Sequence, residues 1–220
     1  MVPTDMQDRV AAIILKATEK FGFALAGGKA LQSLGLTTRP TEDLDIFLDR
    51  MDTALLKEGV SRATKELVAE GYEVEYLKMN ETFVRMRVTE KDGTSVDVDC
   101  AYDYRELPPV TASLGSTVSK EDVILNKVSA LYCRSLPRDF IDLHHIREAG
   151  FLSDDEIIRK SQERDDGFVV DYFIDALRSI RRMEHSDFAA YGVTENEYAR
   201  ILETTTSWAD TLERAKSRKA

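Results

Sequence analysis

Hydrophobic and polar residues alternate along the first 105 residues with two periods, one typical of helices and one typical of strands. Apolar residues recur at helical spacing from Val10 to Ala17, which predicts a helix over 5–21 with Thr4 or Asp5 as its N-cap. The segments that follow are a predicted strand at 23–26, a glycine turn with a helix ending near Gly35, a strand at 43–49, a helix at 52–70, and strands at 72–79, 82–89 and 95–102. This mixture indicates an α/β or, as we expect, an α+β fold with a small mixed sheet.

The pattern changes after Pro108 and Pro109, where the polar stretch TASLGSTVS interrupts it. Beyond residue 119 every periodic segment is helical, and the predicted helices are 120–135, 138–149, 154–163, 168–183 and 194–217. We therefore expect two domains, a sheet-containing domain over 1–107 and a C-terminal helical bundle over 108–220.

The composition is that of a globular protein. The chain has 220 residues, of which 43% are hydrophobic, and this is enough to build a core. Its first residues lack the order of a signal peptide, and no apolar run approaches the roughly 18 residues of a membrane span. We expect a cytoplasmic protein with no membrane partner.

Cysteine and histidine offer little chemistry. Cys100 and Cys133 stand far apart without a CxxC pair, which argues against a disulfide framework or a zinc site, and we expect both thiols to be buried. His144 and His145 are adjacent on a predicted helix and so point about 100° apart. We assign them to packing or solvent rather than to metal binding.

The net charge of -10 argues against a protein that coats nucleic acid through a general basic surface. It leaves room for a local basic groove, because the basic residues are unevenly placed. One cluster lies within 127–147 and another within 178–182. The alternative for each cluster is a solvated helix face.

Two glycines and two aspartates form the first candidate site. Gly27 and Gly28, followed by Lys29, stand at a strand-to-helix turn, where backbone N–H groups and the helix dipole can receive a triphosphate. On the next strand Asp43 and Asp45 project from the face opposite the apolar residues. Because adjacent carboxylates repel unless a cation compensates them, we predict a Mg²⁺ or Mn²⁺ site that engages an NTP. The alternative is a plain tight turn beside a solvated strand face.

A second pair of carboxylates, Asp97 and Asp99, shares one face of the strand at 95–102. One of them would supply the third acidic group, either as base for an attacking hydroxyl or as a further metal ligand. Asp99 is our first choice, and the choice between the two stays open. The alternative is an edge strand that carries acidic residues against aggregation.

The helices at 120–135 and 138–149 carry the third group. Lys127 and Arg134 share one face of the first helix, and Asp139 and Asp142 lie at i, i+3 on one face of the second. Lys127 would neutralise NTP phosphates, Arg134 would add to the same basic surface, and the two carboxylates would position Lys127, an arginine or the base. A structural ion-pair network that joins the two helices is the alternative.

Three segments together are similar to a known family. AGGKALQSLG and TEDLDIFL, followed by NKVSALYCRSLPRDFIDLHHI, resemble the AbiEii-like nucleotidyltransferases, which include the MenT toxins of toxin–antitoxin systems. The resemblance covers residues 22–147, and its four motifs occur in the family's order. It implies a DNA polymerase β-like core with a helical C-terminal part, nucleotide transfer to the 3′ end of tRNA, and a cognate antitoxin as partner.

The resemblance also assigns residues to roles. Gly27 and Gly28 match the glycine turn, Asp43 and Asp45 the metal-binding pair, Lys127 the phosphate-binding lysine, and Asp139 with Asp142 the acidic helix. The second glycine replaces the serine of antibiotic nucleotidyltransferases, which weakens the case for a small-molecule acceptor. The alternatives are transfer to a small molecule or a protein hydroxyl, and a catalytically silent binding module, against which the retained aspartates and lysine argue.

Thr41 stands two residues before Asp43 and falls on its side of the strand if the strand extends that far. The alternative is a threonine at a turn or at the strand entry. Some relatives are silenced by modification of a hydroxyl residue near the catalytic aspartate, so the resemblance implies a regulatory role. A phosphate would add a charge of roughly -1.5 to -2 that repels the triphosphate, and we expect it to switch the enzyme off.

Overall fold

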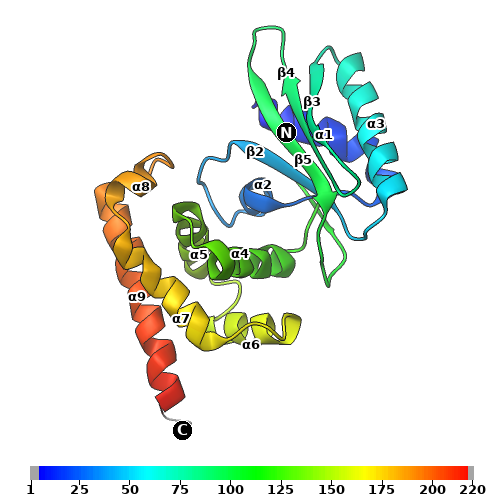
Figure 1. Cartoon of the computed structure of the whole chain (residues 1–220). Coiled ribbons are helices and arrows are strands. Elements are labelled where there is room, and N and C mark those ends of the chain that lie inside the picture. Colours follow the sequence, from blue (N-terminus) through cyan, green and yellow to red (C-terminus); the bar gives the residue numbers. More distant parts are fainter. Residues whose placement is uncertain (1–4, 218–220) are drawn as a thin grey trace. The chain divides into compact units, whose positions relative to one another are not determined.

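Seven strands form one mixed sheet in the order β3-β4-β5-β2-β1-β7-β6, as seen in the computed structural model, which describes residues 5–217 (Figure 1). The strands are β1 (Ala24–Leu25), β2 (Asp43–Leu48), β3 (Glu73–Met79), β4 (Phe83–Thr89), β5 (Ser95–Tyr102), β6 (Val110–Ala112) and β7 (Gly115–Thr117). β2 pairs with β5 and β1 with β7 in parallel, and the remaining neighbours are antiparallel. The sheet is mixed, as the sequence predicts.

The chain divides into two compact units, which are described separately. The first contains residues up to Gly35 together with Thr41–Val123, and the second contains Leu36–Pro40 and the residues from Ile124 onward. This division describes which residues pack together. The expected domain boundary at 107/108 describes which parts of the chain fold independently, and it stays a prediction.

In the first unit, the alternation of β2 decides which face of the sheet is buried. Leu44, Ile46 and Leu48 are almost fully buried, whereas Asp43 and Asp45 are only half-buried. α1 (Met6–Ala17) and α3 (Thr53–Ala69) belong to this unit and pack against each other beside the sheet (Figure 1). The apolar faces of these elements form the core, and the aspartate face of the sheet is left available for chemistry.

Close packing in this core requires a small residue in α3. A Cβ atom on Gly59 would lie 2.2 Å from the ring of Phe23, which precedes β1.

Asp5 caps α1 by accepting the N–H of Gln7, as predicted for one of the two candidates, while Thr4 lies outside the described residues. α2 (Gly27–Ser33) follows β1 directly.

Two short strands lie where the sequence indicates only a break. β6 and β7 form a small hairpin within the stretch after Pro109, and β7 joins the sheet by pairing with β1. The N–H of Val118 then donates to the carbonyl of Leu25 at 2.9 Å. Strands of three residues are too short to show a period of two, and here tertiary pairing decides the structure.

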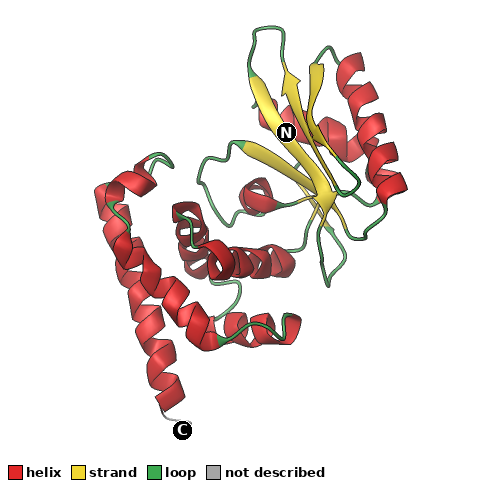
Figure 2. Cartoon of the chain, viewed as in Figure 1, coloured by secondary structure: helices red, strands yellow, loops and turns green. Residues whose placement is uncertain are grey.

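The regular elements of the second unit are helices throughout its described residues, as predicted (Figure 2). Its helices are α4 (Lys120–Arg134, which begins in the first unit), α5 (Pro137–Ala149), α6 (Asp154–Arg164), α7 (Val170–Arg178), α8 (His185–Ala189) and α9 (Glu195–Ser217). The helix expected over 168–183 is shorter and continues as a 3-10 turn over Ser179–Arg182, and α8 is not predicted. α7 packs on α9, where the ring of Phe173 meets Trp208 edge-on.

The two thiols differ in environment. Cys100 is buried on the core face of β5, as predicted, and burial raises its pKa to about 12. Cys133 is exposed, so the expectation of a buried thiol is wrong there.

No helix within residues 5–217 combines the length and the apolar character that crossing a bilayer requires.

Candidate active site

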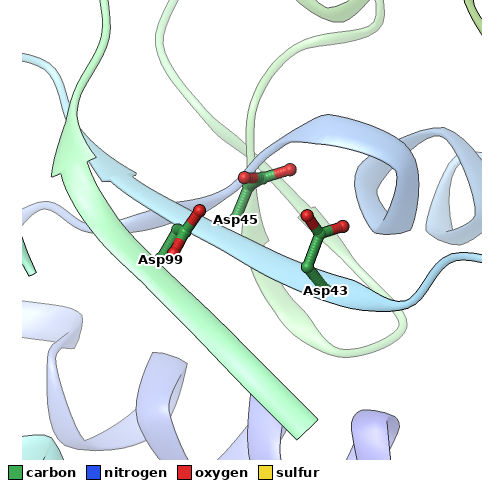
Figure 3. Close-up of side chains that lie close together, drawn as sticks. All are labelled: Asp43, Asp45 and Asp99. Atoms are coloured by element: carbon green, nitrogen blue, oxygen red, sulfur yellow. The ribbon is translucent and has the colours of Figure 1, made fainter. Parts of the chain in front are cut away.

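The register of two parallel strands brings three carboxylates together. β2 and β5 pair Asp43 with Asp97 and Asp45 with Asp99. One carboxylate oxygen each from Asp43, Asp45 and Asp99 can be chosen so that all three lie within 4.8 Å of one another. Figure 3 shows the three side chains on the same side of the two strands. We call this group the aspartate triad.

The aspartate triad fits a divalent cation. Carboxylate oxygens are the ligands that Mg²⁺ and Mn²⁺ prefer, and β strands hold them on a rigid scaffold. Asp43 and Asp45 are half-buried and Asp99 is buried, so water only partly screens their mutual repulsion. A cation between them would remove that repulsion.

Each of the two β5 carboxylates has an arginine partner on β4. The Nε and Nη2 atoms of Arg85 donate to the two oxygens of Asp99 at 2.6 Å each. Arg87 holds Asp97 in the same way at 2.8 and 3.0 Å, and this pairing lowers the pKa of Asp97. Of the two carboxylates that the sequence leaves open, the structure groups Asp99 with Asp43 and Asp45.

The glycine turn gives Asp45 its space. Gly27 has a φ of 60°, and a Cβ atom built on it would lie 1.8 Å from an Oδ atom of Asp45. The N–H of Ala26 donates to the carbonyl of Asp45 at 2.8 Å, which fixes the turn against β2. Gly28 is buried in the first turn of α2. The glycine pair therefore lies directly beside the aspartate triad.

Lys29 and Thr41 occupy different surroundings. The ammonium of Lys29 is buried and pairs with Asp8 at 2.5 Å and with Asp5 at 3.6 Å, so it ties α2 to the region of α1. Thr41 precedes β2, and its hydroxyl donates to the carboxylate and the carbonyl of Asp43, both at 3.4 Å. Thr41 therefore lies beside the aspartate triad, although it is not part of the strand.

Within the second unit, Asp142 joins two cations. Lys127 on α4 approaches it at 2.8 Å, and the Nε and Nη2 atoms of Arg39 donate to its two oxygens at 2.9 and 3.1 Å. Asp142 is fully buried and both cations are nearly so. Burial alone would raise the pKa of Asp142, but the charges of Lys127 and Arg39 hold it below its ordinary value. We call these three residues the cationic cluster.

Asp139 and Arg134 form a neighbouring pair. The guanidinium of Arg134 binds both oxygens of fully buried Asp139 at 2.8 and 3.0 Å. The N–H of Leu136 also donates to Asp139, which therefore caps α5 from its first turn. Each carboxylate of the acidic helix is thus paired with a basic side chain, which both the positioning role and a structural ion-pair network predict.

The histidines pack within the second unit. The Nδ1 atom of His144 bonds the hydroxyl of Thr204 at 3.0 Å, and that of His145 bonds the hydroxyl of Thr37 at 2.8 Å. Neither belongs to a described cluster that could hold a metal ion. These contacts agree with the assignment to packing.

Sequence analysis missed Arg85 and Arg39. Arg85 could have been found from the turn residues Asp92 and Gly93 between the predicted strands at 82–89 and 95–102, because counting outward from a hairpin there pairs Thr89 with Ser95 and then Arg85 with Asp99. Nothing in the sequence pattern around Arg39 indicates its partner. That partner lies 103 positions further along the chain.

Comparisons with known proteins identify a family and a fold. The family described as "Nucleotidyl transferase AbiEii toxin, Type IV TA system" matches residues 11–214. JHP933 from Helicobacter pylori is similar in structure, with 16% identity, a TM-score of 0.61, and coverage of 99% of this chain and 96% of that one. MenT4, a nucleotidyltransferase toxin from Mycobacterium tuberculosis, has 18% identity and a TM-score of 0.63, over 94% and 85% of the two chains. No curated protein matches by sequence. The fold is that of polymerase β-like nucleotidyltransferases.

Proposed function

This chain belongs to the AbiEii nucleotidyltransferase toxin family, and we propose that it transfers a nucleoside monophosphate from an NTP to the 3′ end of tRNA with the help of Mg²⁺ or Mn²⁺. The observation that carries the proposal is the aspartate triad beside the glycine turn. Carboxylates gathered this closely are costly without a cation, and a phosphoryl-transfer enzyme has a use for one.

The first unit would carry the chemistry. Asp43 and Asp45 would hold the metal ion, which when bound stabilises the charge on the transferring phosphoryl group. Asp99 would complete the metal site or accept the proton of the attacking 3′ hydroxyl, and Arg85 orients its carboxylate through two hydrogen bonds. The hydroxyl oxygen bonds to the α-phosphorus, the bond from that phosphorus to the bridging oxygen breaks, and pyrophosphate leaves.

The second unit would supply positive charge. Lys127 would contact the NTP phosphates, because its ammonium has three donors and Asp142 is the partner that the structure gives it within residues 5–217. Arg134, held by Asp139, would add a second cation. Lys29 would contribute to the phosphate site only if its ion pair with Asp8 opened.

The choice of acceptor needs an assay that separates tRNA from the alternatives. The net charge of -10 opposes a polyanionic partner and favours the alternative acceptors, a small molecule or a protein hydroxyl. The assay is therefore incubation of the pure protein with Mg²⁺, each labelled NTP in turn, and either total tRNA or a tRNA-free extract.

We expect label on tRNA with one NTP or a few, its loss with EDTA, and its return with excess Mg²⁺ or Mn²⁺. Label only on protein or small molecules would replace tRNA as the acceptor. Absence of label with every NTP and every acceptor would overturn nucleotidyl transfer itself.

A cognate antitoxin is the expected partner of a toxin of this family.

Thr41 offers a separate means of regulation. Because the Thr41 hydroxyl lies 3.4 Å from an Asp43 carboxylate oxygen, a phosphate there would compete for the cation and repel the NTP. We expect Thr41→Glu to transfer nucleotides far more slowly than Thr41→Val, which keeps the shape without the charge. Equal rates would remove this switch.

A further inference from the structure

All three guanidinium nitrogens of Arg39 donate hydrogen bonds within the second unit. Its guanidinium forms a two-pronged contact with Asp142, donates from Nη1 to the carbonyl of Pro40 at 2.6 Å, and lies 5.5 Å from the ring centroid of Tyr191. Only about 5% of its side chain is exposed. A cation placed so deeply is costly unless its partners are fixed, so its position is well determined.

The backbone around Arg39 is anchored too. The N–H of Arg39 donates to the hydroxyl of Thr37 at 3.2 Å, and that hydroxyl bonds the imidazole of His145 on α5. The segment Leu36–Pro40 therefore belongs to the second unit by its contacts, although it lies between α2 and β2 in sequence. Arg39 is held from both its side chain and its backbone.

Arg39 and Lys127 compete for the same carboxylate. One oxygen of Asp142 accepts Nε of Arg39, and the other accepts both Nη2 of Arg39 and Nζ of Lys127. Two positive charges therefore share one negative charge, and the cationic cluster keeps a net charge of +1. If Arg39 were absent, Asp142 would neutralise Lys127 alone.

We propose that Arg39 is a positioning residue for the NTP: by sharing Asp142 it fixes the Lys127 ammonium and leaves it with uncompensated positive charge for the triphosphate. This inference rests on the proposed role of Lys127. It assigns to Arg39 an action through Lys127 and no contact with the substrate. A charge-assisted contact to phosphate is strengthened when its donor is held in place and is not fully neutralised.

Two substitutions separate geometry from charge. Arg39→Lys keeps the charge and loses the two-pronged contact, so it should raise the Kd for labelled NTP several-fold. Arg39→Gln loses both, and we expect a rise of about tenfold or more, with a smaller change in kcat than in KM. The order of Kd should be Gln above Lys above wild type.

Arg147 supplies a matched control. It binds both oxygens of Asp154 at 2.7 Å and lies 4.4 Å from a Trp208 ring centroid, so it shares with Arg39 a carboxylate and an aromatic partner. Arg147→Gln should lower the melting temperature while leaving the Kd for NTP unchanged. Arg39 has no special role if Arg147→Gln weakens NTP binding as much as Arg39→Gln does.

A double-mutant cycle with Lys127→Ala completes the test. The loss caused by Arg39→Lys should disappear when Lys127 is already absent, because Arg39 acts through it. If Arg39→Lys weakens NTP binding by the same factor in both backgrounds, or Arg39→Gln binds NTP like wild type, the inference is overturned. Should Arg39→Gln fail to fold, the Arg39→Lys cycle still decides.

The proposed function can fail separately. If Lys127→Ala binds NTP as tightly as wild type, the proposed contact of Lys127 with the NTP is wrong, and the positioning role of Arg39 is wrong with it. If Lys127→Ala weakens binding but no acceptor is ever labelled, only the transfer reaction is in doubt.

Discussion

The two ion clusters of this protein have opposite charge balance. The aspartate triad places three carboxylates close together, and one of them, Asp99, is paired with Arg85, so carboxylates outnumber the arginine in this group. The cationic cluster gathers two cations around one carboxylate, Asp142, and has an excess of positive charge. The first kind of cluster is complementary to a divalent cation, and the second kind is complementary to an anionic phosphate group.

Burial differs between the clusters as well. Asp43 and Asp45 are half-buried, so water can partly solvate their carboxylates. Asp142 is fully buried, and its cations must already be in place when the protein folds. From this comparison we expect a ligand to complete the first cluster, whereas contacts among the protein's own side chains form the second.

Among the predicted changes, neutralising Asp45 should reduce nucleotide transfer the most. Asp45→Asn keeps the shape and removes one ligand charge, so we expect nucleotide transfer to fall at least ~100-fold, the effect of losing several kcal/mol of metal stabilisation. Because carboxylate repulsion also falls, the metal-free melting temperature should not decrease.

Calorimetry checks the Asp45→Asn prediction without an activity assay. Mn²⁺ should raise the melting temperature of the wild type and have little effect on the variant. An equal Mn²⁺ shift in both proteins would mean that Asp45 is not a metal ligand.

Crowding Asp45 from the opposite side should have the next largest effect. Gly27→Ala places a Cβ atom 1.8 Å from an Asp45 oxygen, so the carboxylate must move and transfer should fall at least ~10-fold. The positive φ adds a backbone penalty of about 1–2 kcal/mol to the free energy of folding.

Gly35→Ala is the control for Gly27→Ala. Gly35 has a φ of 70° and nothing lies within 4 Å of its Cβ position, so the variant has the backbone penalty without the collision. Urea denaturation should show a loss of stability in both variants, at least as large in Gly27→Ala because of its collision, with slow transfer in Gly27→Ala alone. Equal activity in the two would show that Asp45 tolerates displacement.

The first unit's site could be largely predicted from sequence because its determinants are local. Asp43 and Asp45 need only the period of a strand, and the apolar residues between them fix which face they take. That Asp99 rather than Asp97 joins them depends on the register of β2 against β5. Register between strands about fifty residues apart is set by tertiary packing, which leaves no local pattern.

The second unit shows the limit more clearly. The spacing of Asp139 and Asp142 predicts a shared helix face, and each indeed holds a basic side chain. The partner Arg39 comes from a short segment that precedes β2 and packs with the helices, and no periodicity can indicate that. β6 and β7 were missed for a related reason, because pairing rather than propensity forms them.

Removing Arg85, the arginine that pairs with Asp99 of the aspartate triad, should have a smaller effect on metal binding and transfer. Arg85 binds both oxygens of Asp99 and competes with a divalent cation for them. Arg85→Gln should therefore tighten Mn²⁺ binding several-fold, since its charge opposes that of the cation, while transfer slows because Asp99 is less well oriented.

Arg87→Gln is the matched control for Arg85. Arg87 makes the same two-pronged contact one register pair along the sheet, with Asp97 as its partner. Isothermal titration with Mn²⁺ should find wild-type affinity in this variant. If Mn²⁺ binds Arg85→Gln more weakly than wild type, Arg85 supports the metal site rather than opposing it.

The smallest predicted effect concerns His144, a buried neutral group in the second unit. Burial lowers its pKa below the ordinary 6.5, with Glu148 acting to raise it and His145, Arg200 and Arg147 acting to lower it. The His144 imidazole therefore stays neutral in the folded protein at pH values at which it takes up a proton in the unfolded chain.

The sign of the pH dependence follows from this difference. Above pH 6.5 His144 is neutral in both states and stability is fully present, and as the pH falls through 6.5 toward the lower folded pKa the unfolded state gains protons and stability is lost. The loss is at most ~1.4 kcal/mol for each unit by which the pKa is lowered. His144→Gln keeps a polar partner for Thr204, which bonds the imidazole at 3.0 Å, and cannot titrate. Urea denaturation at about pH 7.5 and about pH 5.5 should show a steeper loss of stability for wild type than for His144→Gln. Parallel losses in the two proteins would mean that His144 takes up its proton as readily in the folded protein as in the unfolded chain.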